Sequence, residues 1–260
     1  IDLILPRGIK DKHLKRIIKK FFNFFDLEIK RKNNFQDRYF DSVAEISNDE
    51  KRILEKISEI ALSSVANQWS IIQSLKHIKE KNIPGEIVEC GVYKGGSLIL
   101  ICLIAQMLEL KKKIIGYDTF ENGFDSISEF DLSAKGKKIE KLSFEKNFFP
   151  TVNEVLNIIK KFNIDSNFYP KLVKGKTQDT LLLDENVPDS ISFLRLDTDI
   201  YEPTADQLDK LYPRLSKGGI LHIDDYGHCP GVKKAVDEYF VNKKIWLHRI
   251  DYTCRLLIKD

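Results

Sequence analysis

The chain has 260 residues, of which 42 are Lys or Arg and 39 are Asp or Glu, giving a formal net charge of +3. A hydrophobic content of 42% and a charged content of 31% are typical of globular domains and exclude a disordered or collagen-like chain. The charge is uneven, since residues 1–40 hold 11 basic and 5 acidic side chains, whereas the remainder holds 31 basic and 34 acidic ones. This slightly acidic main body argues against nucleic-acid binding, which needs basic charge on the main face.

The sequence shows no targeting or membrane segment. No apolar run approaches the roughly 18 residues that a membrane span requires, and no signal peptide is evident near Ile1. The four cysteines form no C-x-x-C pair and are too sparse for a disulfide framework. We therefore expect a cytoplasmic protein, and since the chain starts at Ile1 rather than Met, we expect the numbering to begin inside a longer product.

The basic surplus coincides with an expected amphipathic helix over residues 12–25, whose apolar side chains recur at helical spacing. We divide the chain into a basic N-terminal helical extension, residues 1–47, and a main domain, residues 48–260. We expect this helix to pack on the main domain or on a second copy of the chain in a homo-oligomer. The alternative is peripheral contact between residues 12–25 and an anionic membrane.

Further along the chain, helical patterns cover residues 48–62 and 67–81. Short β-rich runs then alternate with helical ones. The expected strands are residues 86–92, 113–117, 169–173, 191–196, 220–223, 246–250 and 255–258, and the expected helices are residues 97–108, 152–162, 204–215 and 230–240. This alternation predicts an α/β fold with a mostly parallel sheet, helices on both faces and an antiparallel edge. Residues 121–139 are polar and without periodicity, which predicts a lid over the site.

A glycine-rich turn, Glu89-x-Gly91-x-x-x-Gly95-Gly96-Ser97, lies at the first strand-to-helix junction, where glycines let the backbone approach a ligand. Its spacing differs from the dinucleotide pattern, and Glu89 would repel a phosphate. The acid favours a cationic ligand with an ammonium or sulfonium centre. Asp118 ends the next strand, where a carboxylate can bind a ribose diol. Packing glycines and a capping Asp118 are the alternative, but together these residues favour a ribose-bearing ligand.

Carboxylates also end two later strands, Asp197 and Asp199 after ISFLRL, and Asp224 and Asp225 after ILHI. They emerge at the same edge of the sheet as the glycine turn, and acids crowded together need a cation to stay ionised. We expect Asp197, Asp224 and Asp225 to hold Mg²⁺, with Mn²⁺ or Ca²⁺ as alternatives. Asp199 precedes a helix start and fits a helix cap better than a metal ligand.

Other polar residues near this edge have simpler interpretations. His228 lies in the loop after Asp225 and is a secondary candidate for a general base. His222 alternates with apolar neighbours inside a strand, which indicates a core histidine. Arg195 stands between two leucines, and we expect it to pair with a neighbouring carboxylate. Cys229 has no basic neighbour in the sequence, so we assign it no role.

The chain resembles the macrocin O-methyltransferase (TylF/MycF-like) family in four segments: PGEIVECGVYKGGS, GYDTFENG, LRLDTDIYEPTADQLDKLYPRLSKGGILHIDDYG and GVKKAVDEYF. The resemblance runs from about Asn67 to the C-terminus. It implies a Rossmann-like, seven-stranded methyltransferase sheet, S-adenosylmethionine (SAM), a divalent metal at Asp197, Asp224 and Asp225, and a sugar hydroxyl as methyl acceptor. By position, it implies cofactor-binding roles for Glu89, Gly91, Val92, Tyr93, Gly95, Ser97, Asp118, Thr119, Phe120, Gly175, Asp179 and Asp197.

These features predict Mg²⁺-dependent methyl transfer from SAM to one of two vicinal hydroxyls, with Asp197 or else His228 taking the proton. The metal acids are also similar to those of catechol O-methyltransferases, where a lysine base stands three positions after the first metal Asp. Ile200 occupies that position here, so a phenolic acceptor is the less favoured alternative. A non-catalytic cofactor-binding protein is a further alternative, against which the intact metal acids argue.

Overall fold

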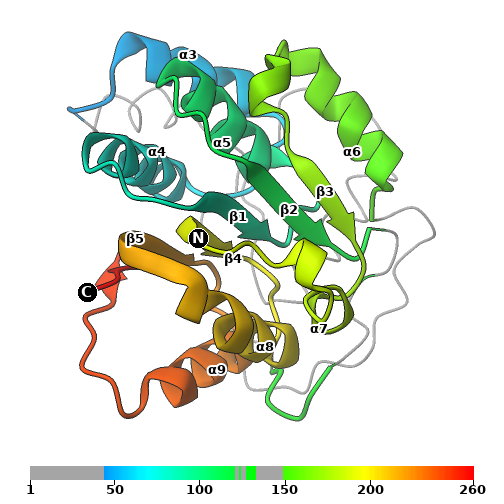
Figure 1. Cartoon of the computed structure of the whole chain (residues 1–260), viewed down its shortest axis with the longest axis vertical. Helices are drawn as coiled ribbons and strands as arrows, with labels where there is room; N and C mark the ends of the chain where they lie inside the picture. Colours follow the sequence, from blue (N-terminus) through cyan, green and yellow to red (C-terminus); the bar gives the residue numbers. More distant parts are fainter. Residues whose placement is uncertain (1–43, 121–122, 124–126, 133–148) are drawn as a thin grey trace, which may run out of the picture.

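The structure, a computed structural model, describes residues 44–120, 123, 127–132 and 149–260 (Figure 1). The helix expected over residues 12–25, nearly all of the 1–47 extension and most of the lid expected over residues 121–139 lie outside the described residues. Their roles in docking, membrane contact or closure therefore stay predictions.

Seven strands form one sheet in the order β3-β2-β1-β4-β5-β7-β6 (Figure 1). The strands are β1 (Glu86–Cys90), β2 (Ile114–Asp118), β3 (Lys171–Lys174), β4 (Ile191–Leu196), β5 (Leu215–Ile223), β6 (His248–Arg249) and β7 (Arg255–Ile258). Strands β1 to β5 pair in parallel, whereas β7 pairs antiparallel with β5 and with β6. The predicted seven-stranded, mostly parallel sheet with an antiparallel edge is confirmed. Its strand order reverses between β1 and β4, and open α/β sheets bind ligands at such a point.

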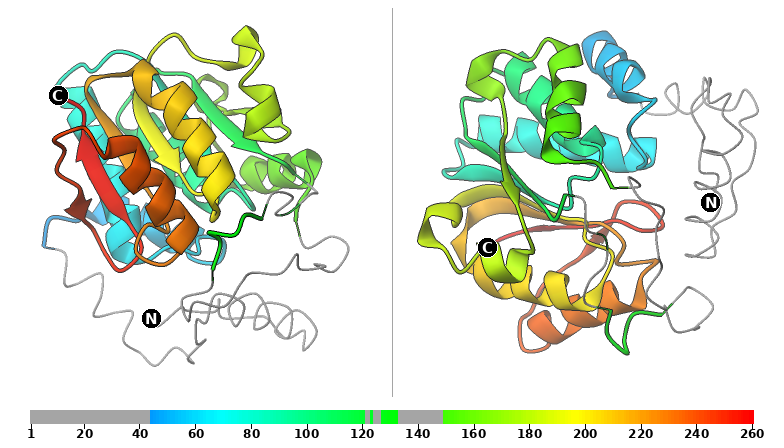
Figure 2. Two further views of the ribbon diagram at one scale, coloured as in Figure 1. Left: turned by 90° about the horizontal axis from the view of Figure 1, so that it is seen from below. Right: turned by 90° about the vertical axis from the view of Figure 1, so that its right-hand side faces the viewer.

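Helices cover both faces of this sheet (Figure 2). One face carries α3 (Asn48–Ile57), α4 (Val65–Glu80), α5 (Gly96–Met107) and α6 (Val152–Ile159), the other carries α8 (Tyr201–Leu211) and α9 (Pro230–Phe240), and the short α7 (Thr177–Thr180) follows β3. Strand residues alternate between two cores, so that Ile87 and Phe193 pack with α4 and α5 while Val88 and Leu194 pack with α8 and α9. Among the described helices, none combines the length and apolar character needed to cross a bilayer.

Some element boundaries differ from the sequence prediction. Helix α8 begins at Tyr201 rather than at residue 204, because Pro203 is tolerated in a first turn, where its missing N–H leaves no helical hydrogen bond unmade. Strand β5 begins at Leu215 rather than at residue 220, because Gly218 and Gly219 lie in an irregular stretch of its pairing with β4 instead of a turn. Strand β6 spans two residues only.

Candidate cofactor and metal site

The loops after the parallel strands meet at one edge of the sheet, where four non-glycine residues have positive φ. They are Tyr93 (48°), Phe120 (43°), Asp199 (62°) and Asp225 (59°), which follow β1, β2, β4 and β5 respectively. Each such conformation costs about 1–3 kcal/mol, and residues of this kind cluster at functional sites. The carboxyl edge of the sheet is therefore the candidate site.

The glycine turn after β1 brings the backbones of β1 and β4 close together. Gly91 has a φ of 91°, and a Cβ at this position would lie 1.8 Å from the carbonyl oxygen of Asp197. Gly95 has a φ of 84° and is the N-cap of α5, with Ser97 half-buried in the first turn. Gly95 has no side chain that could cap α5, and no side-chain cap is seen among the described residues, so the N–H groups of the first turn face this edge.

Asp118, at the end of β2, holds this turn in place. Its Oδ2 accepts hydrogen bonds from the backbone N–H groups of Val92 and Tyr93, both at 2.8 Å, and its Oδ1 accepts one from the N–H of Phe120 at 2.9 Å. The hydroxyl of Thr119 lies 3.5 Å from Oδ1. Because a carboxylate has roughly four acceptor sites, Oδ1 keeps capacity for a ligand hydroxyl. Asp118 thus caps the following segment, and its role at a ribose stays a prediction.

The other segments predicted for the cofactor reach the same edge. The backbone of Phe120 lies at the turn, while its ring is 1% exposed and belongs to the core that contains α5. Gly175 follows β3, and its N–H donates to the carbonyl of Asp118 at 2.9 Å. That bond brings α7, with the exposed Asp179, beside the end of β2.

A buried arginine links three of the strand ends. Arg195 on β4 is 1% exposed, and its guanidinium donates to Glu89 Oε1 at 2.9 Å, Asp197 Oδ2 at 2.6 Å and Asp224 Oδ2 at 2.6 Å. In the sheet register, Arg195 stands between Glu89 on β1 and His222 on β5. Side chains two residues apart along a strand share the same face of the sheet. Asp197, two residues after Arg195, and Asp224, two residues after His222, therefore lie on the same face as Arg195. The expected pairing of Arg195 with a carboxylate is confirmed.

Glu89 has one oxygen engaged and one available. Burial raises its pKa to about 8, although the Arg195 guanidinium acts in the opposite direction. Its Oε2 is buried and accepts no hydrogen bond from any residue that the structure describes. A buried acceptor without a donor is destabilising, so this oxygen fits the cationic ligand predicted for Glu89.

Asp224 is oriented by four donors. Its Oδ2 accepts from Arg195 and from Asn67 Nδ2 (3.0 Å), and its Oδ1 accepts from Thr253 Oγ1 (2.9 Å) and the N–H of Asp225 (3.1 Å). Burial alone would raise the pKa of Asp224, but Arg195 and these donors hold it below its ordinary value. The sequence analysis missed Asn67 and Thr253, which lie at the start of α4 and in the β6–β7 loop, and no spacing pattern marks either of them.

The acidic residues form a cluster suited to a cation. Asp197, Asp224 and Asp225 each offer a carboxylate oxygen within 4.8 Å of the others, and Asp199, Asp225 and Cys229 form a second such group. Asp225 belongs to both groups, so its carboxylate lies close to those of Asp197 and Asp199. Burial and mutual repulsion raise the pKa values of Asp197 and Asp225, and that of Asp199 to about 8. A divalent ion would replace the shared protons, and these hard oxygen ligands fit Mg²⁺.

The interpretation of Asp199 as a helix cap is wrong. The N-cap of α8 is Ile200, and no side chain of that cap accepts a helical N–H. The first turn of α8 is held instead by Asp131, a residue that the sequence analysis did not single out. Its buried Oδ1 accepts from the N–H of Tyr201 at 2.8 Å. Asp199 therefore belongs to the acidic cluster and does not cap α8.

The two histidines differ in their surroundings. His222 is fully buried, and burial together with the Arg195 guanidinium lowers its pKa to about 3, which confirms the predicted core histidine. His228 lies in the loop after Asp225, where its backbone N–H donates to the backbone carbonyl of Asp225 at 2.9 Å. Its Nδ1 is 3.3 Å from the hydroxyl of Tyr252. The role of His228 as a base stays a prediction.

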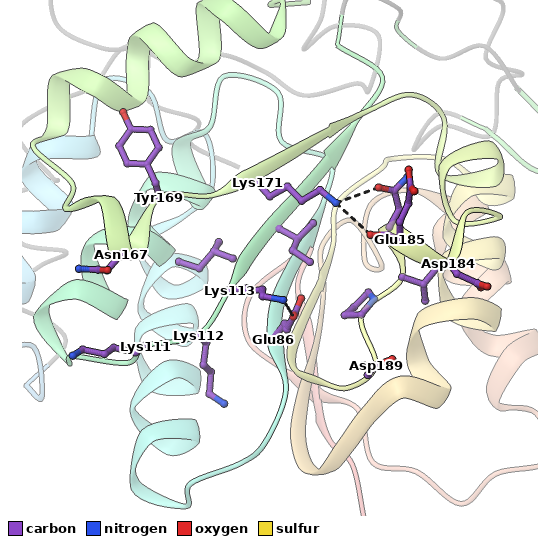
Figure 3. Close-up of a pocket in the computed structure, with 15 residues that line it drawn as sticks. Glu86, Lys111, Lys112, Lys113, Asn167, Tyr169, Lys171, Asp184, Glu185 and Asp189 are labelled. Atoms are coloured by element: carbon purple, nitrogen blue, oxygen red, sulfur yellow. Dashed lines mark hydrogen bonds and ion pairs between the residues drawn. The ribbon is translucent and has the colours of Figure 1, made fainter.

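The pocket in Figure 3 lies away from this site, among residues at the amino ends of β1, β2 and β3. It has a volume of about 510 Å³ and a mixed lining of lysines and acids. Lys113 pairs with Glu86, Lys171 donates to the carbonyl of Glu185, and Lys112 donates to backbone carbonyls. Because these lysines already have partners, we assign no ligand to this pocket.

The family profile of macrocin O-methyltransferases (TylF) matches residues 27–259, which include the glycine turn and the acidic cluster. The chain belongs to this family. Its match begins within the segment predicted as an extension, and the boundary at residue 47 stays a prediction.

The chain is similar to individual proteins that are named as O-methyltransferases. The chain is 31% identical over 171 residues to demethyldecarbamoylnovobiocin O-methyltransferase of Streptomyces niveus, covering 65% of this chain and 63% of that protein. It is 28% identical over 159 residues to 8-demethyl-8-(2,3-dimethoxy-alpha-L-rhamnosyl)-tetracenomycin-C 4'-O-methyltransferase of Streptomyces olivaceus, covering 60% and 58%. These matches span less than two thirds of each relative. The solved O-methyltransferase NovP superposes with a TM-score of 0.68 at 28% identity, covering 76% of this chain and 81% of that one.

Proposed function

We propose that the protein is a SAM- and Mg²⁺-dependent O-methyltransferase acting on a hydroxyl of a sugar or glycosylated small molecule. The observation that carries this proposal is the meeting of two groups at one sheet edge. One group is the carboxylates of Asp197, Asp224 and Asp225, and the other is the glycine turn that Asp118 orders. Membership of the macrocin O-methyltransferase family supports methyl transfer. The named substrate of the tetracenomycin relative carries a rhamnosyl group, which supports a sugar acceptor.

Three parts of the edge match SAM. The N–H groups at the start of α5, which the Gly95 N-cap leaves without a side-chain cap, suit the carboxylate of its methionine end. The Oε2 atom of Glu89 suits its ammonium group, and Asp118 suits its ribose hydroxyls. Gly175 and Asp179, beside the end of β2, would border the adenine. SAM supplies an electrophilic methyl group, and transfer to an acceptor oxygen breaks the sulfur–carbon bond and leaves S-adenosylhomocysteine (SAH).

The acids supply the remaining chemistry. Asp197, Asp224 and Asp225 would hold Mg²⁺, which lowers the pKa of a bound hydroxyl and stabilises negative charge on its oxygen. Asp197 is the proposed proton acceptor, because it belongs to the acidic cluster and Arg195 fixes the position of its Oδ2. His228, in the loop after the acids, is the second candidate. Vicinal hydroxyls, as found on sugars, suit an ion that keeps open positions.

The residue three positions after Asp197 favours a sugar acceptor over a phenolic one. Ile200 stands where catechol-type enzymes carry their lysine base, and it is 4% exposed in the core. The chain therefore offers no lysine at this position to deprotonate a phenol.

The test is methyl transfer from isotopically labelled SAM to nucleotide sugars, glycosylated natural products and catechols, followed by mass spectrometry. We expect one added methyl on a sugar hydroxyl, lost in EDTA and restored by excess Mg²⁺. Asp197→Asn should lower kcat by about 10²–10⁴, the usual range for losing a general base. Asp49→Asn changes an exposed acid on α3 and is the matched control, with activity unchanged. Turnover that resists EDTA, or that survives in Asp197→Asn, would contradict the proposal.

A further inference from the structure

We infer that Arg195 is a positioning residue that couples cofactor binding to metal binding. The inference rests on the proposed function. The guanidinium joins Glu89, the first residue of the glycine-rich turn, to Asp197 and Asp224, two of the three proposed metal ligands.

The geometry makes one planar group the common partner of both subsites. Nη1 donates to Glu89 Oε1 at 2.9 Å and to Asp197 Oδ2 at 2.6 Å, while Nη2 donates to Asp224 Oδ2 at 2.6 Å. The three carboxylates come from the neighbouring strands β1, β4 and β5. The guanidinium is rigid, so the position of one carboxylate constrains the positions of the other two.

The charges in this network are not balanced by Arg195 alone. When all three carboxyl groups are ionised, one cation faces three carboxylates, and the side chains of Arg195 and Glu89 are each 1% exposed. A buried ion pair is a poor source of stability, and apolar residues of similar size often serve the fold as well. The arrangement therefore points to a role in the site rather than in stability. Its excess negative charge fits two cationic ligands, an ammonium group at Glu89 Oε2 and a divalent ion at the acidic cluster.

Either ligand would then prepare the site for the other. A ligand that fixes Glu89 also fixes Arg195, and through it the oxygens of Asp197 and Asp224, so that the second ligand has less ordering to supply. Such coupling is reciprocal, because the factor by which Mg²⁺ raises SAH affinity must equal the factor by which SAH raises Mg²⁺ affinity. We expect a factor of about ten, within the usual range for coupled sites.

The experiment measures this factor on the full chain. Calorimetry gives the Kd of SAH in EDTA and in saturating MgCl₂, and electron paramagnetic resonance gives the Kd of Mn²⁺ with and without SAH. Arg195→Lys keeps the positive charge but loses the planar guanidinium that donates through both Nη1 and Nη2. Glu89→Gln keeps the shape of the side chain but loses its ion pair with Arg195. Both variants should lower the factor from about ten to about one. Arg52→Lys alters an exposed pair on α3 and should keep the wild-type factor.

The coupling factor separates positioning from a merely structural role. Glu89→Gln weakens SAH binding itself, but it should leave the Mn²⁺ affinity measured without SAH within about twofold, since the metal acids are intact. If Arg195→Lys does not fold, as judged by circular dichroism, Glu89→Gln alone decides. A wild-type protein that binds SAH and Mn²⁺ independently overturns the inference and leaves the proposed function standing, as do folded variants that keep the factor. A wild-type protein that binds neither ligand overturns both.

Discussion

Replacing Gly91 with alanine tests whether the turn after β1 positions the first metal acid. The added Cβ would stand 1.8 Å from the carbonyl oxygen of Asp197 and 2.6 Å from its carbonyl carbon. Both atoms belong to backbone, so the clash can be relieved only if β1 and β4 move apart at the site. The φ of 91° adds conformational strain for any residue with a side chain.

The cost follows from these two effects. A positive φ costs alanine about 1 kcal/mol, and a forced shift of packed backbone costs about 1–3 kcal/mol. We therefore expect the free energy of unfolding to fall by about 2–4 kcal/mol, which lowers Tm by roughly 5–15 °C in a chain of this size.

Gly95→Ala is the matched control for this substitution. Gly95 has a similar φ of 84°, but its added Cβ would lie 3.5 Å from Val155 Cγ1, an ordinary contact, so we expect a loss of about 1 kcal/mol. Urea denaturation measures both losses, and Mn²⁺ titration should show weaker binding in Gly91→Ala alone, because only there is Asp197 displaced. Equal destabilisation of the two variants, or an unchanged Mn²⁺ affinity in Gly91→Ala, would refute this reasoning.

Three further changes test the electrostatics and the supports of the site. Asp224→Asn weakens the hydrogen bonds that Arg195, Asn67 and Thr253 donate to this carboxylate and should cost about 1–3 kcal/mol in urea denaturation. Asp225→Asn relieves the repulsion between neighbouring carboxylates and should leave metal-free stability unchanged or higher; equal losses in the two variants would argue against this difference. Burial raises the pKa of Asp199 to about 8, whereas the unfolded chain releases this proton near pH 4. Between about pH 4 and 8 the native protein therefore binds one more proton than the unfolded chain, so the contribution of Asp199 to the free energy of unfolding falls as the pH rises. In EDTA, the free energy of unfolding of the wild type minus that of Asp199→Asn should fall as the pH rises over this range, and Mg²⁺ should remove the trend. A difference that rises with pH would contradict the raised pKa of Asp199. Asp131→Ala removes the buried cap of α8 and should cost about 1–2 kcal/mol in thermal unfolding, and an unchanged Tm would contradict that role.

The fold was predictable where the periodicity of the sequence was unambiguous. The bounds of β4, α9 and β7 match the predicted ones, because each is a continuous strand or helix pattern with clear polar or proline boundaries. The starts of α8 and β5 were displaced, since Pro203 also fits inside a first turn and the glycines at 218–219 also fit a bulge. Such choices depend on the neighbouring strand, which local sequence does not contain.

The candidate site was predictable to a similar degree. Asp197 and Asp224 follow apolar runs, so their place at the carboxyl ends of strands could be predicted from the sequence. The particular carboxylates that Arg195 binds could not, because they lie on three strands whose order is set by the whole fold. Asn67 and Thr253 carry no spacing signal either, since each supplies a single donor to Asp224 from a distant element.

A crystal structure of the protein with SAH and Mn²⁺, using the anomalous signal of manganese, tests the central claim most directly. We expect a manganese peak in contact with Asp197, Asp224 and Asp225, and SAH along the glycine turn with its ribose at Asp118. Manganese bound away from these carboxylates, or SAH bound away from the turn, would contradict the assignment of this edge as the cofactor and metal site.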